Sequence, residues 1–258
     1  MRKTLLILLI LLVPVFVNAQ WGEKISKKIG DYTFVTDNDT NEFTVSLTIS
    51  RNGKQIYKDT YLDFIEDIKQ VQLEPGGKNY IFIDFFSGGA HCCSSLLVGE
   101  LKSDKFVVLD SAVYGNSGYN VEDIDKDGVK EIISGNDMFA YAFTNYSETR
   151  FPIRVQRIRY DKIKDFTEDF EEVVLKEIAE FKKDLDEITK ESFECPATED
   201  EDTFNTDAGS IKTILAAIVA DYYSIGKVEK GYDLINKVYK CSDKNKFVKI
   251  LKEDFKLK

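Results

Sequence analysis

The sequence predicts an α+β protein in which a mainly antiparallel β domain, built as a partial propeller or as blade-like sheets, precedes an α-helical domain. Short segments of alternating apolar and polar residues, separated by turns rich in glycine, asparagine and aspartate, occupy residues 31 to about 160. From Phe166 onward the apolar residues recur at helical spacing instead. We therefore expect a signal peptide over 1–19, a β domain over 20–162 and a helical domain over 163–258.

The first residues have the pattern of a secretory signal peptide. Arg2 and Lys3 precede an apolar run from Leu5 to Val17, whose 13 residues are too few to span a bilayer, which needs about 20. Val17 and Ala19 are small enough for the −3 and −1 positions of a signal-peptidase site, so cleavage is expected after Ala19. The mature protein is then expected in the periplasm or outside the cell, with no membrane span.

The β domain is expected to contain mainly antiparallel strands. Tyr32–Val35 and Phe43–Ile49 alternate in polarity, and Asn52-Gly53 supplies a two-residue hairpin turn before Gln55–Tyr57. No long helical period separates the strand segments, which argues against parallel strands joined by helices. Further strands are expected at Tyr80–Phe86, Ser94–Leu101, Phe106–Leu109, Glu131–Ser134 and Ile153–Tyr160.

The helical domain is expected to contain four helices. The first runs from Phe166 to Ile188 with Thr167 as its N-cap, and the second covers Ile211 to Tyr223 and stops at Gly226. Two shorter helices are expected over about 228–239 and 243–255, with Ser242 able to cap the last. The acidic residues 199–202 between the first two helices are interpreted as a solvated loop.

Export makes the four cysteines informative, because disulfides persist outside the cytosol. We expect Cys195 to pair with Cys241, since both lie in the C-terminal half. Cys92 and Cys93 are adjacent, and Cα atoms about 3.8 Å apart across a trans peptide lie below the usual disulfide range of roughly 4.4–6.8 Å. A bridge between Cys92 and Cys93 is nevertheless favoured. The alternatives are a buried free thiol, or bridges from both to the C-terminal half.

The clearest chemical signal is the run Asp123-x-Asp125-x-Asp127-Gly128-x-x-Glu131, placed just before an apolar strand. Calcium prefers six to eight oxygen ligands at about 2.3–2.6 Å, and alternate carboxylates on a tight loop can turn toward one centre. The glycine permits the sharp turn, and the final glutamate closes the shell from the start of the strand. An EF-hand would need an acid at the twelfth position, which is Ser134, and helical flanks, so that motif is rejected.

This pattern resembles the calcium loops of integrin-type β-propeller repeats, the FG-GAP and VCBS-like group, in which D-x-D-x-D-G-x-x-D/E precedes a short apolar strand. The resemblance covers residues 119–134, and a degenerate copy lies over 72–83 at an offset of 51 residues. About 130 residues are too few for a closed propeller of four or more blades, so a partial one is expected. The resemblance implies one Ca²⁺ held by the side chains of Asp123, Asp125, Asp127 and Glu131 and by the backbone carbonyl of Val129.

Composition narrows the classes of function. His91 is the only histidine in 258 residues, which excludes sites that need two imidazoles, and the net charge of −10 argues against a nucleic-acid partner. We expect an exported, calcium-binding, non-enzymatic protein that binds a protein or glycan at the cell envelope or outside the cell. One alternative is a hydrolase that uses His91 with Cys92, Cys93 or Ser94. Another is an acidic inhibitor or immunity-type protein that meets a basic partner.

Overall fold

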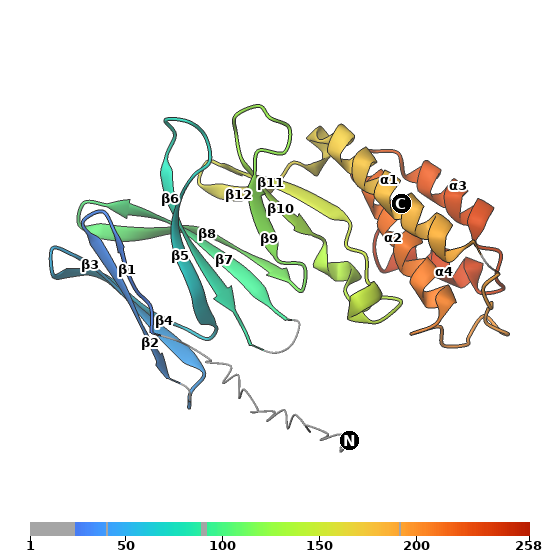
Figure 1. Ribbon diagram of the computed structural model, residues 1–258, viewed down its shortest axis with the longest axis horizontal. Coiled ribbons are helices and arrows are strands. Elements are labelled where there is room, and N and C mark those ends of the chain that lie inside the picture. The colour runs from blue at the N-terminus through green and yellow to red at the C-terminus, as the bar shows by residue number, and fades with distance from the viewer. Residues whose placement is uncertain (1–23, 40, 89–91, 191) are drawn as a thin grey trace, which may run out of the picture.

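The computed structural model describes residues 24–39, 41–88, 92–190 and 192–258. The predicted α+β fold class is confirmed, because the described residues form three antiparallel sheets followed by four α-helices (Figure 1). The expected signal peptide lies outside the described residues, and so does His91. Within the described ranges, no helix combines the length and the apolar character needed to cross a membrane.

Each sheet is a four-stranded meander whose strands pair in the order in which they occur in the chain, which is the strand order of a propeller blade. The first sheet contains β1 (Ser26–Ile29), β2 (Tyr32–Asp39), β3 (Thr44–Arg51) and β4 (Lys54–Tyr61). The second contains β5 (Phe64–Gln72), β6 (Asn79–Phe86), β7 (Ser94–Lys102) and β8 (Lys105–Gly115). The third contains β9 (Tyr119–Glu122), β10 (Glu131–Gly135), β11 (Ile153–Arg159) and β12 (Lys162–Asp165), so the expected domain boundary after residue 162 falls within β12.

The meanders pack face to face, and an apolar core fills each interface. Phe34 and Ile49 of the first meander share one core with Ile83 of the second, whereas Phe82 of the second shares another core with Ile132 of the third. Consecutive residues of β6 therefore face different cores, because side chains alternate across a strand. This explains why the middle meander needs a strand that is apolar on both faces.

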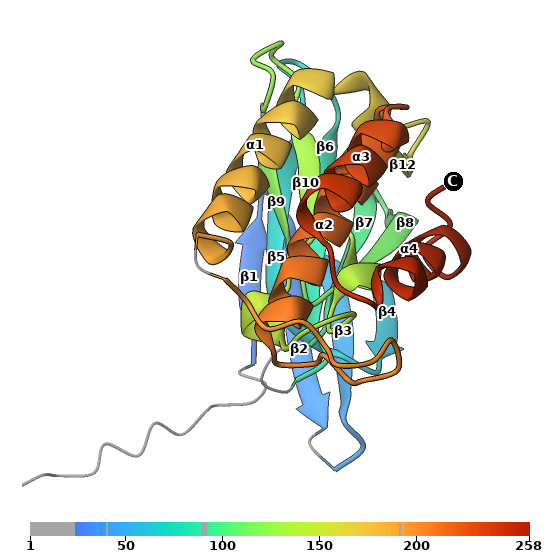
Figure 2. The ribbon, with the colours of Figure 1, turned by 90° about the vertical axis from the view of Figure 1, so that its right-hand side faces the viewer.

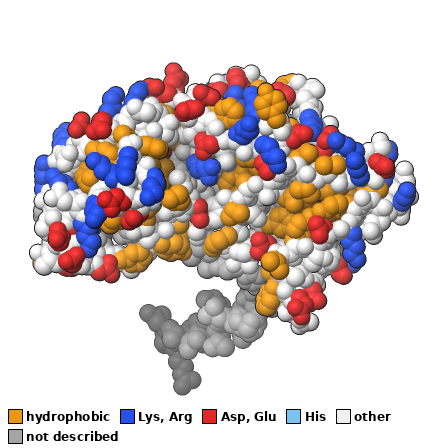
Figure 3. Space-filling view, turned by 180° about the vertical axis from the view of Figure 1, so that it is seen from behind, with side chains coloured by type: hydrophobic (Ala, Val, Ile, Leu, Met, Phe, Trp, Pro, Cys, Tyr) orange, Lys and Arg blue, Asp and Glu red, His pale blue; other side chains and the backbone are white. Residues whose placement is uncertain are grey.

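The four helices form a third core beside the last meander. They are α1 (Glu171–Ile188), α2 (Asp207–Ser224), α3 (Val228–Val238) and α4 (Lys244–Glu253). Seen from the helical end, they stand in front of the sheets (Figure 2). Helix α2 is buried along most of its length, and Phe139 and Phe143, which follow β10, join the same core. In the view from behind, apolar side chains gather over the sheets, while charged side chains of both signs are spread over both halves (Figure 3).

Helix α1 begins later than the sequence predicts. The Thr167 hydroxyl accepts the Val155 N–H at 2.9 Å and donates to Asp165 Oδ1 at 2.6 Å, so it is committed to β11 and β12 and does not cap the helix. Residues Thr167–Asp169 form a short 3₁₀ turn, and α1 starts at Glu171. Ser242 does not cap α4 either: the residue before that helix is Asp243, and the Ser242 hydroxyl donates to the carbonyl of Pro196 at 3.3 Å.

The structure pairs Cys195 with Cys241 and Cys92 with Cys93. Cys195 lies in the long connection between α1 and α2, and Cys241 lies between α3 and α4, with Cα atoms 5.3 Å apart. This bridge closes a loop across 46 residues and ties the last two helices to the connection that precedes α2.

Replacing both Cys195 and Cys241 by alanine is expected to destabilise the helical domain by about 2–4 kcal/mol, because the unfolded chain gains the entropy of a long open loop. Urea unfolding followed by far-ultraviolet circular dichroism measures the change. The matched control is the Cys92→Ala, Cys93→Ala protein, in which the lost bridge joins neighbours and closes no long loop. Equal losses of unfolding free energy in the two proteins would contradict the assignment of this stabilisation to the long loop that the Cys195–Cys241 bridge closes.

A buried carboxyl group joins the helices to the third meander. Asp221 of α2 is fully buried, its Oδ1 accepts the N–H of Ile153 at the start of β11 at 3.0 Å, and its Oδ2 has no described partner. Burial, reinforced by the nearby charge of Glu177, raises the pKa of Asp221 to about 8 despite that hydrogen bond. The folded protein therefore keeps this proton at neutral pH.

Between about pH 4 and about pH 8 the unfolded chain has lost the Asp221 proton while the folded protein retains it, so stability falls as pH rises through this window. Asp221→Asn keeps an acceptor for Ile153 and does not titrate. We expect the free energy of unfolding of this variant to equal that of the wild type near pH 4 and to exceed it by about 2 kcal/mol or more near pH 8. Urea unfolding at several pH values across this range tests it, with Asp233→Asn at an exposed position of α3 as the matched control.

Candidate metal centre

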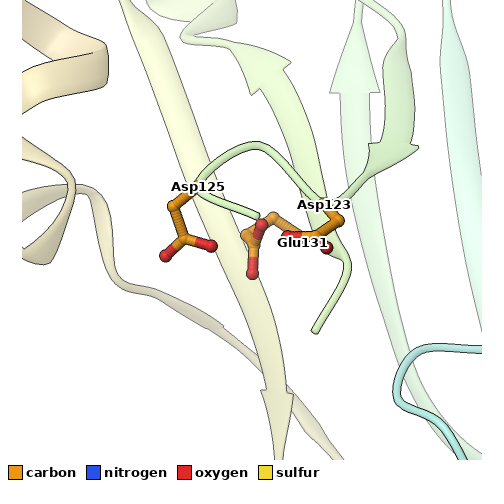
Figure 4. Close-up of side chains that lie close together, drawn as sticks. All are labelled: Asp123, Asp125 and Glu131. Carbon is orange, nitrogen blue, oxygen red and sulfur yellow. The ribbon is translucent and has the colours of Figure 1, made fainter. Parts of the chain in front are cut away.

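The acidic run forms the loop between β9 and β10 (Figure 4). Gly128 has a φ of +90°, which side-chain-bearing residues rarely adopt, so the turn depends on glycine here. The Lys130 N–H donates to the carbonyl of Leu73 at 2.7 Å, in the loop between β5 and β6. The two loops thus connect the first and second strands of successive meanders and project from the same end of the sheets (Figure 1). The degenerate sequence copy lies at the structurally equivalent position.

Each of the four carboxylates has one oxygen held by a backbone amide of the same loop. These hydrogen bonds fix the carboxylates without using their second oxygens, because an ionised carboxylate can accept through both. The Gly128 N–H donates to Asp123 Oδ2 at 3.0 Å, that of Asp127 to Asp125 Oδ1 at 3.2 Å, that of Val129 to Asp127 Oδ1 at 2.7 Å, and that of Ile124 to Glu131 Oε2 at 3.1 Å.

Three of the remaining oxygens meet the guanidinium group of Arg157. Its Nε donates to Glu131 Oε1 at 2.6 Å, and its Nη2 lies 2.6 Å from the same oxygen. The same Nη2 donates to Asp127 Oδ2 at 2.9 Å and to Asp125 Oδ2 at 3.3 Å. The fourth oxygen, Asp123 Oδ1, is buried and has no partner among the described residues.

Strand pairing places Arg157 at this loop. Ile132 of β10 pairs with Gln156 of β11, so the next residues outward, Glu131 and Arg157, face each other across the ladder. Glu131 is 0% exposed and the Arg157 side chain is 15% exposed. Because strand pairing and not sequence proximity joins them, Arg157 is not among the site residues predicted from the sequence. The signal that was available is the three arginines of Ile153–Tyr160, on a strand that follows a loop with four acidic residues and only two lysines.

The carboxylates differ in their electrostatic environment. Burial raises the pKa of Glu131, although the Ile124 N–H and Arg157 counteract part of that shift. The Val129 N–H, together with Arg157, lowers the pKa of the exposed Asp127. Burial disfavours the charge of Arg157, but its contacts with Glu131 and Asp127 raise its pKa overall. The loop is therefore a charged network with one buried member and several solvent-facing ones.

The donor set fits a hard divalent cation. Oxygens from Asp123, Asp125 and Glu131 lie within 4.8 Å of one another, as ligands of one ion require, and Figure 4 shows these side chains together. Asp127 is connected to them through Arg157, and Val129 contributes its N–H to the loop. Four carboxylates against one guanidinium leave an excess of negative charge, and the buried, unpartnered Asp123 Oδ1 is an oxygen that a cation would satisfy.

The cysteine segment lies at the opposite end of the second meander. Strand β6 runs from the Leu73 end to Phe86, about 23 Å at 3.3 Å per residue, and Cys92 to Ser94 follow beyond it. The bridge between Cys92 and Cys93 leaves neither as a free thiol, and the Ser94 hydroxyl donates to the Gly115 carbonyl at 3.3 Å. The described part of this segment therefore lies far from the acidic loop.

Comparisons with known proteins give limited information. No family model matches the chain, and no solved structure matches it. An uncharacterized protein of Sinorhizobium fredii, y4bJ, is 29% identical over 128 residues, which is 46% of this chain. The chain spans about a fifth of the length of that relative. The name of the relative states no activity, so the site must be interpreted from its geometry.

In calcium-free solution, Glu131→Ala is expected to destabilise the β domain by about 3 kcal/mol, since it leaves the largely buried Arg157 without its closest partner. Asp125→Ala removes an exposed contact to the same guanidinium and is expected to cost under about 1 kcal/mol. Urea unfolding in the presence of a chelator measures both. Similar losses in the two variants would show that Glu131 is not the residue on which this charge network depends.

Proposed function

We propose that this protein is an exported, calcium-binding, non-enzymatic binding module of the cell envelope or extracellular space. The observation that carries the proposal is the arrangement of the four carboxylates. Each has one oxygen fixed by a loop amide, and oxygens of Asp123, Asp125 and Glu131 lie within 4.8 Å of one another. Asp123 Oδ1 is buried without a partner among the described residues. This arrangement supports a cation site that is organised by the loop itself.

Calcium is the metal that the donors favour. The site offers only oxygen atoms, whereas zinc prefers nitrogen and sulfur ligands. Magnesium demands octahedral geometry and keeps several waters, so a crowded carboxylate loop suits it less well. The resemblance of the sequence pattern to FG-GAP and VCBS-like loops, and the position of its degenerate copy in the preceding meander, support the same choice. Bound calcium would neutralise the loop and hold it against β10.

The arrangement favours binding over hydrolysis. A hydrolase built on the cysteine segment would need a free nucleophile, but Cys92 and Cys93 are bridged and the Ser94 hydroxyl is engaged with a backbone carbonyl. A metal-assisted version would need the acidic loop nearby, and the two lie at opposite ends of β6. A scaffold of packed meanders that presents loops at one end is suited to binding a protein or glycan.

Calcium is expected to bind at a single site, with the dissociation constant of about 10⁻⁴–10⁻³ M typical of extracellular modules. At a hundredfold excess over that constant, it is expected to stabilise the fold by about 2.7 kcal/mol. Calorimetry and thermal unfolding after chelation measure both. The double variant Asp123→Asn, Asp125→Asn is expected to lose binding, and Asp37→Asn, on β2, is the matched control. Indifference of the wild type to calcium up to about 10 mM would refute the proposal.

A further inference from the structure

Arg157 uses the same oxygens that a bound cation would need. Its guanidinium contacts Glu131 Oε1, Asp125 Oδ2 and Asp127 Oδ2, which are the carboxylate oxygens not held by loop amides. Of the four carboxylate oxygens that the loop amides leave, only Asp123 Oδ1 has no partner in the described structure. The Arg157 guanidinium therefore already contacts three of the four oxygens that a bound cation would use.

We propose that Arg157 is an internal competitor for the metal, which sets the affinity of the loop and must give up Asp125 and Asp127 when a divalent cation binds. This inference rests on the proposed calcium binding. Two cations that share the same oxygens repel each other, and each oxygen has few lone pairs to offer. The contact with the buried Glu131 is the shortest of the three and faces Arg157 across the strand ladder, so it is the one that persists longest.

The competition reaches the helical domain through Phe170. The guanidinium carbon of Arg157 lies 4.9 Å from the centre of the Phe170 ring, and Phe170 is the buried residue immediately before α1. The same junction is held by the Phe166 N–H on the Val155 carbonyl and by the Val155 N–H on the Thr167 hydroxyl. A guanidinium displaced from the loop changes its stacking on Phe170. Calcium binding to the acidic loop is therefore expected to alter the junction between β11 and α1.

The first test is calcium titration by calorimetry of the full chain after chelation. Arg157→Gln is expected to bind calcium about tenfold more tightly than the wild type, within the range usual for coupled sites. Arg157→Lys keeps the charge but loses the forked geometry, so an intermediate affinity is expected. The matched control is Arg159→Gln, which removes a positive charge two residues along β11 that contacts none of the four carboxylates in the described structure. Its affinity is expected to stay within about twofold of the wild type.

The second test measures the junction in the wild-type protein, so that it does not depend on how the Arg157 variants fold. Calcium is expected to change the hydrogen exchange of the backbone amides of residues 166–174. The same amides are expected to be unaffected by calcium in the Asp123→Asn, Asp125→Asn protein. An unchanged exchange pattern in calcium-loaded wild type would overturn the link to Phe170.

The outcomes separate this inference from the proposed function. Equal calcium affinities of the wild type and Arg157→Gln would overturn the competition and leave calcium binding intact. Binding by Arg157→Gln but not by the wild type would support the competition at the loop and overturn calcium binding as a function of the native protein. Absence of binding by both proteins up to about 10 mM calcium would overturn the calcium proposal itself, and the competition with it.

Discussion

The buried charge of Glu131 is the constraint around which the third meander is organised. A carboxylate with no solvent exposure requires a partner, because an unpaired buried charge costs several kcal/mol. Arg157 supplies that partner from the facing position on β11. The position of Arg157 in turn orients Asp125 and Asp127 toward one region and places its guanidinium over Phe170. One ion pair thus connects the acidic loop, the sheet and the start of α1.

The three meanders repeat one structural unit without forming a closed ring. The second meander is buried on both faces, whereas the third is followed by the helices, whose core includes Phe139 and Phe143 from the segment after β10. Because the loops between the first and second strands meet at one end, a change in the acidic loop is next to the preceding loop at Leu73. This end of the sheets is where the proposed binding function has its chemistry.

The proposed calcium site and the disulfides suit the same compartment. Disulfides persist where the environment is oxidising, and a weak oxygen-ligand calcium site fills only where calcium is plentiful, as it is outside the cytoplasm. The Cys195–Cys241 bridge is a cross-link between segments of the helical domain, and a bound ion would form a second cross-link, between the loop and the meander. The proposed export provides the conditions that both of them need.

Local periodicity and residue spacing were sufficient to predict the fold class, most of the strands of five or more residues, the helical half and the acidic loop. The predictions missed β1, β9 and β12, which are four-residue edge strands too short to show an alternation, and β5, whose alternation is interrupted by a register shift near Ile65. Only the tertiary structure decided that Thr167 binds Val155 instead of capping α1, and that Arg157 pairs with Glu131. These contacts join residues 12 and 26 positions apart, and the pairing of separate strands brings them together, which residue spacing within one segment does not reveal.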